Sequence, residues 1–212
     1  CLMFAFCAWA YTQEESSDRK EQDELSLAVG AFENGFYDAG LNLLDKFISQ
    51  FPQSGLVPEA SFYIGRCYFN LKQYARAIEQ FKNMLSSGSS LEGRDNTPAE
   101  NQGVPQAVTI MSALRNRIYY WLAESYSRNQ DAPSAYNFYE KLTLEFPDSI
   151  YMAQAYYSLG WCLFEQGKFK EAKDKFSAFK DKFPGNILVK EADYKIAECF
   201  YNSKDYSQLK SY

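Results

Sequence analysis

The 212-residue sequence contains no histidine. This absence excludes Ser-His and Cys-His nucleophilic pairs, as well as any metal site that depends on imidazole. A glycine-rich phosphate loop is also missing, because Gly88 and Gly93 lie in a polar stretch that no Gly-Lys-Ser follows. Carboxylate pairs such as Glu14-Glu15 fit a solvated helix surface. The sequence therefore predicts a protein that is not an enzyme, with no catalytic residues, no cofactor and no metal site.

An excess of basic residues is lacking as well. The 22 Lys and Arg residues are outnumbered by 27 Asp and Glu residues, and the net charge is −5. Nucleic-acid-binding domains carry a basic patch or stripe. In a basic run such as residues 168–182, Glu171, Asp174 and Asp181 interrupt the lysines. We expect no nucleic-acid partner.

Cysteines are few, and their places argue against a disulfide framework. Cys1 and Cys7 belong to an apolar N-terminal segment, whereas the other three occupy one equivalent position in a repeat that is described below. Equivalent positions on stacked helices lie about 8–10 Å apart, beyond the ~7 Å Cα separation that a disulfide spans. We expect Cys67, Cys162 and Cys199 to be buried free thiols.

Long apolar runs are absent except at the start, where residues 1–10 read CLMFAFCAWA. Ala8-Trp9-Ala10 fits the small-x-small rule of signal peptidase, so residues 1–10 are interpreted as a signal-peptide remnant and residues 11–20 as a flexible leader. The segment starts at Cys1 rather than at a Met and has no charged residues, so we expect its beginning to be missing. A truncated membrane anchor and a lipidated Cys7 are alternatives. A spanning helix needs roughly 20 apolar residues, and Phe6 is not the small residue that precedes a lipidated cysteine.

Residues 151–184 have the pattern of two antiparallel helices. Gly167 suits the left-handed turn that ends a helix, and Pro184 blocks continuation of the second helix. Each helix carries an apolar stripe at helical spacing. The stripe residues are Tyr156, Leu159, Gly160 and Leu163 in the first helix, and Ala172, Phe176 and Phe179 in the second.

The same hairpin recurs along the chain. Small residues equivalent to Gly160 are separated by 37, 58, 37 and 37 residues, and 58 is one period plus an insertion of 21. A second column keeps the same register in the second helices, and Phe-Pro terminators follow three of them. The first column is Ala28, Gly65, Ala123, Gly160 and Ala197; the second is Gly40, Ala77, Ala135, Ala172 and Leu209; the terminators begin at Phe51, Phe146 and Phe183.

This pattern resembles the tetratricopeptide repeat, whose signature is W-x2-L-G-x2-Y…A-x3-F…P. The resemblance implies an all-α, right-handed superhelical solenoid of stacked antiparallel helix hairpins, here with a 37-residue period. The predicted array covers residues 21–212, with hairpins at approximately 21–57, 58–85, 106–150, 151–187 and 188–212, the last one truncated, and a loop insertion at 86–105. The long unit and the Phe-Pro-x-Ser/Asn ending are similar to the periplasmic branch of the superfamily, including the BamD-like outer-membrane assembly lipoproteins and the CpoB-like Tol-Pal coordinators.

In this family the first helix of each hairpin lines a concave groove that binds ligands. The residues three before, one after and four after the reference position share one face of that helix. In the five hairpins they are Leu25, Val29 and Phe32; Phe62, Arg66 and Phe69; Tyr120, Glu124 and Ser127; Tyr157, Trp161 and Phe164; and Tyr194, Glu198 and Tyr201. All members of the last four sets except Ser127 are candidate partner-binding residues. The alternative is that many of these rings pack between hairpins as core.

The resemblance implies a non-enzymatic scaffold for protein–protein interaction in the bacterial cell envelope. We expect a monomeric array that binds an envelope protein or peptide segment through the aromatic groove, in a periplasmic or secreted location that can be outer-membrane associated. Contact with a membrane would come only through a partner or a missing anchor. Two alternatives remain. The chain is the helical N-terminal part of a larger cell-wall enzyme, or it is an assembly component of an extracellular surface or gliding apparatus.

Overall fold

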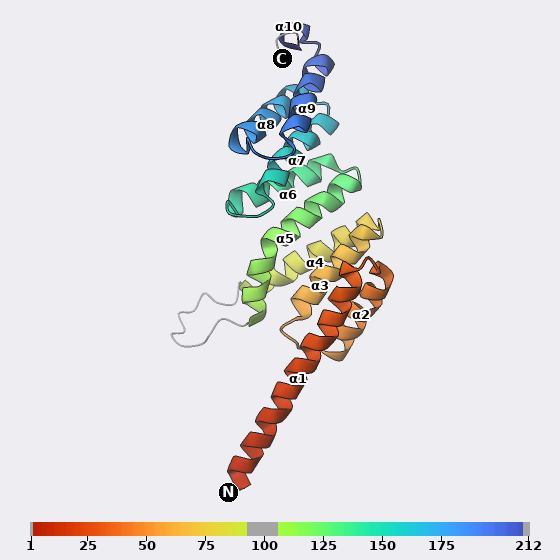
Figure 1. Cartoon of the computed structure of the whole chain (residues 1–212), viewed down its shortest axis with the longest axis vertical. Helices are drawn as coiled ribbons and strands as arrows, with labels where there is room; N and C mark the ends of the chain where they lie inside the picture. The colour runs from red at the N-terminus through yellow and green to blue at the C-terminus, as the bar shows by residue number, and fades with distance from the viewer. Residues whose placement is uncertain (1, 93–105, 210–212) are drawn as a thin grey trace. The chain divides into compact units, whose positions relative to one another are not determined.

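The computed structural model describes residues 2–92 and 106–209, and these residues form ten α-helices and no strand (Figure 1). The predicted all-α, stacked-hairpin solenoid is confirmed. The helices are α1 (Leu2–Glu33), α2 (Tyr37–Gln50), α3 (Val57–Asn70), α4 (Tyr74–Glu92), α5 (Gln106–Arg128), α6 (Ala132–Glu145), α7 (Met152–Glu165), α8 (Phe169–Lys182), α9 (Val189–Asn202) and α10 (Tyr206–Leu209).

The turn inside each hairpin is set by one left-handed residue. At Gly167 (φ 73°) the amide donates to the carbonyl of Phe164, and the next amide donates to Leu163. This pair of hydrogen bonds satisfies the last carbonyls of the first helix. The same bonds recur at all five turns, and the left-handed residues are Gly35, Lys72, Gln130, Gly167 and Lys204.

The chain divides into two compact units within α5, one ending at Leu114 and the other beginning at Arg115. In the first unit α2 packs on α1 and on α3, and α3 packs on α4. In the second unit α6 packs on α7, α7 on α8, and α8 on α9. Within each unit, consecutive helices run antiparallel and stack on one another (Figure 1). Each unit therefore buries its apolar stripes between neighbouring helices.

Two glycines of the reference column lie where helices pack face to face. A Cβ atom on Gly160 would lie 2.8 Å from Cδ1 of Phe176, and one on Gly65 would lie 2.6 Å from Cε1 of Phe81. Both phenylalanines are fully buried. The small residues therefore give room to a ring from the second helix of the same hairpin.

Two predicted segments differ from the structure. Residues 11–20, expected as a flexible leader, belong to α1, because no glycine or proline interrupts the chain between Leu2 and Val29. Residues 86–92, expected as the start of a loop at 86–105, are helical, since α4 continues to Glu92. Ser86 and Ser87 stay helical, with their hydroxyls donating to the carbonyl of Asn83. The remainder of the predicted loop, residues 93–105, lies outside the described residues.

Cys67, Cys162 and Cys199 are free and buried. Burial, with the charge of Glu124 second, raises the pKa of Cys162 to about 12. Burial also raises the pKa of Cys67 and that of Cys199 to about 11. Each of these three cysteines therefore packs as a small apolar residue in its hairpin.

Candidate functional site

The first helices of the fourth and fifth hairpins, α7 and α9, bring aromatic rings around one lysine. The rings of Trp161 and Phe164 stack with centroids 6.2 Å apart. Lys195 Nζ lies 4.4 Å from the Trp161 centroid, 5.0 Å from that of Phe164 and 5.7 Å from that of Tyr194. The ammonium donates to Glu198 Oε2 at 2.6 Å. We call these five residues the Lys195 cluster.

The electrostatics of the Lys195 cluster explain how a cation is buried there. Lys195 is only 9% exposed, and a buried charge is costly unless it is compensated. The ring faces attract the ammonium through their quadrupoles, and the Glu198 carboxylate neutralises it. Trp161 and Phe164 are half-buried, whereas Tyr194 is 61% exposed. The cluster is thus an ordered aromatic surface with balanced charge.

Four of these five residues were candidates from the sequence, and Lys195 was not. Lys195 lies two residues before the reference Ala197, and this position is not among the three that were predicted to line the groove. A related contact occurs in the first unit, where Phe32 of α1 meets Tyr63 and Arg66 of α3. The ring centroids of Phe32 and Tyr63 are 5.3 Å apart, and Arg66 Cζ lies 5.0 Å from the Phe32 centroid. The residue two before the reference is therefore part of the face between neighbouring first helices.

Next to the Lys195 cluster, the third hairpin holds a carboxylate through a buried hydroxyl. Tyr139 of α6 is 1% exposed, and its hydroxyl donates to Glu124 Oε1 of α5 at 2.5 Å. Burial, with the charge of Glu124 second, raises the pKa of Tyr139 well above its usual value, while a hydrogen bond with Ser158 of α7 opposes this. Glu124 itself is half-buried. Its carboxylate is therefore fixed where α5, α6 and α7 meet.

The other candidates in the second unit differ in exposure. Tyr120 is half-buried and stacks on Tyr151, with centroids 4.2 Å apart. Tyr157 packs on the buried rings of α8, and burial, followed by the charges of Glu191 and Glu198, raises its pKa to about 12. Tyr201 is 62% exposed and contacts Tyr206. Tyr120 and Tyr157 thus serve mainly in packing, whereas Tyr201 offers free ring surface.

In the first unit one candidate is wrong. Phe62, three residues before the reference Gly65, is fully buried and packs against Phe81 of the second helix. Phe62 therefore belongs to the core. Arg66 is half-buried over Phe32, and Phe69 is half-buried against Tyr74. Both keep part of their surface exposed.

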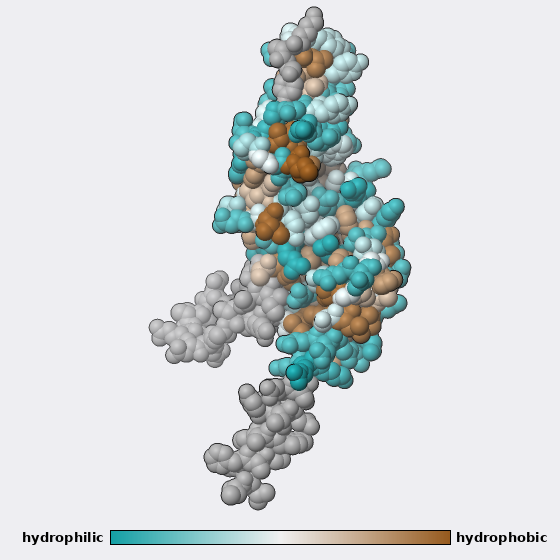
Figure 2. All heavy atoms as spheres, viewed as in Figure 1, coloured by the Kyte–Doolittle hydropathy of each residue, from teal (hydrophilic) through white to brown (hydrophobic). Residues whose placement is uncertain are grey.

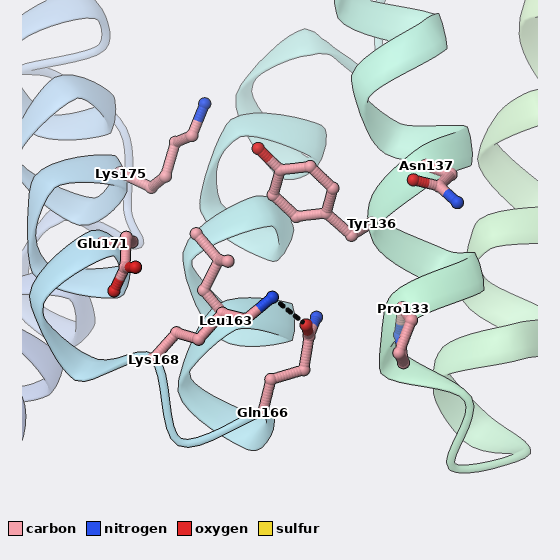
Figure 3. A pocket seen from close by; sticks show the side chains of 8 residues that line it. All are labelled: Pro133, Tyr136, Asn137, Leu163, Gln166, Lys168, Glu171 and Lys175. Atoms are coloured by element: carbon pink, nitrogen blue, oxygen red, sulfur yellow. Dashed lines mark hydrogen bonds between the residues drawn. The ribbon is translucent and has the colours of Figure 1, made fainter.

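A hollow of about 500 Å³ in the second unit is lined by residues of α6, α7, α8 and the turn between α7 and α8. In Figure 3, Tyr136 of α6 and Lys175 of α8 face each other across it, and Lys168 donates to Gln166 below them. Lys175 Nζ is 5.8 Å from the Tyr136 centroid. None of the candidate groove residues lines this hollow, which is bounded by Pro133, Tyr136, Asn137, Leu163, Gln166, Lys168, Glu171 and Lys175. It is separate from the face that carries the Lys195 cluster.

The part of the chain that the structure describes shows neither a metal cluster nor a membrane-spanning helix. No group of three or more Cys, Asp or Glu residues in it comes together as a metal site. None of its helices is long and apolar enough to cross a membrane. On the face shown in Figure 2, apolar residues form small separate patches among hydrophilic ones.

Comparison with known families agrees with the hairpin geometry. Models of the tetratricopeptide repeat match residues 25–90, 118–149 and 154–186, more than half of the chain. The chain belongs to the tetratricopeptide-repeat family. No curated protein is significantly similar in sequence. Repeats of this family typically form non-catalytic scaffolds.

Solved tetratricopeptide-repeat structures share this fold. The crystal structure of MamA has a TM-score of 0.65 at 15% identity, covering 90% of this chain and 86% of MamA. A Podosopora anserina putative kinesin light chain has a TM-score of 0.64 at 12% identity, covering 91% and 90%. YrrB, described as having an unusual peptide-binding site, has a TM-score of 0.59 at 17% identity, covering 88% and 77%. At these identities the likeness concerns the fold alone.

Proposed function

We propose that this tetratricopeptide-repeat protein is a non-enzymatic scaffold that binds a peptide segment of a partner protein across the first helices of its second unit. The observation that carries the proposal is the Lys195 cluster. Its rings are held in place by an ammonium and a carboxylate, so little side-chain entropy remains to be lost on binding. Trp and Tyr are also enriched among the residues that dominate binding energy.

The exposure of the rings supports an apolar ligand surface. Tyr194 and Tyr201 lie seven residues apart on α9, two helical turns along one face, and are 61% and 62% exposed. The half-buried Trp161 and Phe164 continue this surface onto α7. A partner segment with apolar anchors at helical spacing fits such a surface. The peptide-binding description of YrrB belongs to a protein of the same fold, which agrees with this kind of ligand.

The test is selection of a random peptide display library on the purified chain, followed by affinity measurement of the selected peptides. The double variant Trp161→Ala/Tyr194→Ala should bind these peptides at least tenfold more weakly, because loss of a hot-spot residue costs about 2 kcal/mol or more. The matched control is Ile150→Ala/Ile187→Ala. It removes two residues that are 81% and 91% exposed and lie outside the first helices.

The control variant should keep the affinity of the wild type. Equal affinity of both double variants would show that the Lys195 cluster does not bind the selected peptides. Circular dichroism of each variant verifies that the hairpins remain folded.

We also propose that the protein works in the bacterial cell envelope, in the periplasm or outside the cell, and takes part in envelope or outer-membrane assembly. The support is the apolar segment that ends in Ala8-Trp9-Ala10. Expression of the complete gene in its host, cell fractionation and N-terminal sequencing give the test. A mature protein that starts at Tyr11 outside the cytoplasm is expected, and a cytoplasmic protein that keeps residues 2–10 would contradict the proposal.

A further inference from the structure

One hairpin combines a buried tyrosine with a carboxylate on the ligand-facing helix. In the first four hairpins, the residue that follows the reference position can be compared with the residue 15 positions later, on the second helix of the same hairpin. The pairs are Val29 with Leu44, Arg66 with Phe81, Glu124 with Tyr139, and Trp161 with Phe176. Only in the third pair does the second helix supply a hydroxyl, and there the hydroxyl meets the carboxylate.

From this geometry we infer that Glu124 selects a cationic side chain, Lys or Arg, in the partner segment, and that Tyr139 is the positioning residue that orients its carboxylate. The inference rests on the proposed function and adds the charge class of the ligand. It makes Glu124 a determinant of specificity, whereas the Lys195 cluster provides apolar contact.

Within the described part of the chain, the charge of Glu124 is not balanced by an ion pair. Among the described residues no Lys or Arg lies within ion-pair distance of it, whereas Glu198 is paired with Lys195. The influence of Glu124 extends to α7, where its charge contributes to the raised pKa of Cys162. An uncompensated carboxylate that is partly removed from water interacts more strongly with an incoming cation than a fully solvated one does.

The carboxylate also has capacity left for a ligand. An ionised carboxylate accepts about four hydrogen bonds, and the Tyr139 hydroxyl occupies one position on Oε1. Tyr139 is nearly fully buried and donates from below the surface. Glu124 is only half-buried, so other acceptor positions of its carboxylate are open to a ligand.

A purely structural role for Glu124 makes a different prediction. If Glu124 served only to accept the hydrogen bond of the buried Tyr139 hydroxyl, the neutral oxygen of a glutamine would serve as well. Glu124→Gln therefore separates the two roles, because it keeps an acceptor of the same length and removes the charge. Glu171→Gln on α8 is the matched control, since Glu171 is exposed and lies outside the first helices.

The experiment uses the peptide display selection on wild type, Glu124→Gln, Tyr139→Phe and Glu171→Gln. Peptides selected on the wild type and on Glu171→Gln should share a Lys or Arg at a fixed place relative to their apolar anchors. The best such peptide should bind Glu124→Gln about tenfold more weakly, in line with a charge-assisted hydrogen bond. A version with norleucine in place of its Lys or Arg should bind wild type and Glu124→Gln equally. Tyr139→Phe should stay folded, as phenylalanine fills this place in two other hairpins, and should lose two- to threefold in affinity.

Each outcome has a separate meaning. Peptides that depend on Trp161 and Tyr194 but carry no shared cation, or that bind Glu124→Gln as tightly as wild type, would overturn this inference and leave the proposed function standing. If no selected peptide depends on Trp161 and Tyr194, the proposed function fails and this inference fails with it.

Discussion

The substitution Gly160→Ala tests the close contact on which the fourth hairpin depends. The added Cβ would lie 2.8 Å from both Cδ1 and Cε1 of Phe176. Real Cβ atoms do not approach a ring carbon this closely, so either the ring or a helix must move. Phe176 is fully buried in the second unit and has no solvent to rotate into.

The expected cost follows from two opposing effects. Overpacking a core site costs about 1–3 kcal/mol, whereas Gly to Ala inside a helix gains about 1 kcal/mol. The third hairpin has Ala123 with Tyr139 at these two positions, which indicates that a modest shift can accommodate the methyl group. We therefore expect Gly160→Ala to lower the free energy of unfolding by about 1 kcal/mol.

Gly30→Ala is the matched control, because Gly30 lies inside α1 and a Cβ there meets nothing within 4 Å. It should raise the free energy of unfolding by about 1 kcal/mol, so the same chemical change has opposite signs at the two positions. Urea unfolding is followed by circular dichroism, and by tryptophan emission for the second unit, in a Trp9→Phe background. Phe176→Leu should relieve the effect of Gly160→Ala, since Ala28 and Leu44 occur together in the first hairpin. If Gly160→Ala is as stabilising as Gly30→Ala, the contact does not limit packing.

Three further predictions concern a turn, the reactivity of the thiols and the pH dependence of stability. Gln130 has φ 62°, and the left-handed backbone conformation costs a non-glycine residue about 1 kcal/mol. Gln130→Gly should therefore raise the free energy of unfolding by about 0.5–1 kcal/mol. A thermal melt that shows a loss of stability would contradict this strain argument. The thiols of Cys67, Cys162 and Cys199 stay protonated in the folded chain up to a pKa of about 11, 12 and 11, above the ordinary value of 9.0. They should resist iodoacetamide at mildly alkaline pH until urea is added, as peptide mass spectrometry can verify. Because these pKa values are raised on folding, the thiols stabilise the fold fully below the unfolded pKa, and this stability should fall as the pH rises from about 9 through about 11–12.

The hairpins and their turns could be predicted from the sequence because several columns of residues keep one spacing. Gly160 and Gly167 mark a close packing position and a left-handed turn, and the structure has both. At the turns of the second, third and fifth hairpins, Lys72, Gln130 and Lys204 take the left-handed conformation. Composition does not reveal these three turns, since only the repeat register identifies them.

The candidate site was less predictable, because it depends on which way each side chain turns between neighbouring helices. Lys195 would be placed on a solvated surface by its residue type, yet the rings of Trp161 and Phe164 and the carboxylate of Glu198 bury it. Phe62 has the residue type of a groove ring and packs inside instead. The length of α1 does not follow from composition, because the charged and hydroxyl residues of 11–20 are compatible both with disorder and with a helix.

The hydrogen bond between Tyr139 and Glu124 also matters for how an array of similar hairpins assembles correctly. Neighbouring hairpins with interchangeable apolar faces can pair out of order, which is a characteristic failure of repeat proteins. If α8 replaced α6 beside α5, Phe176 would leave the Glu124 carboxylate without its donor, and Tyr139 placed beside α7 would meet Trp161 in place of an acceptor. A buried polar group without its partner costs about 1–3 kcal/mol, so this one bond penalises the swapped arrangement and marks the third hairpin as distinct from its neighbours.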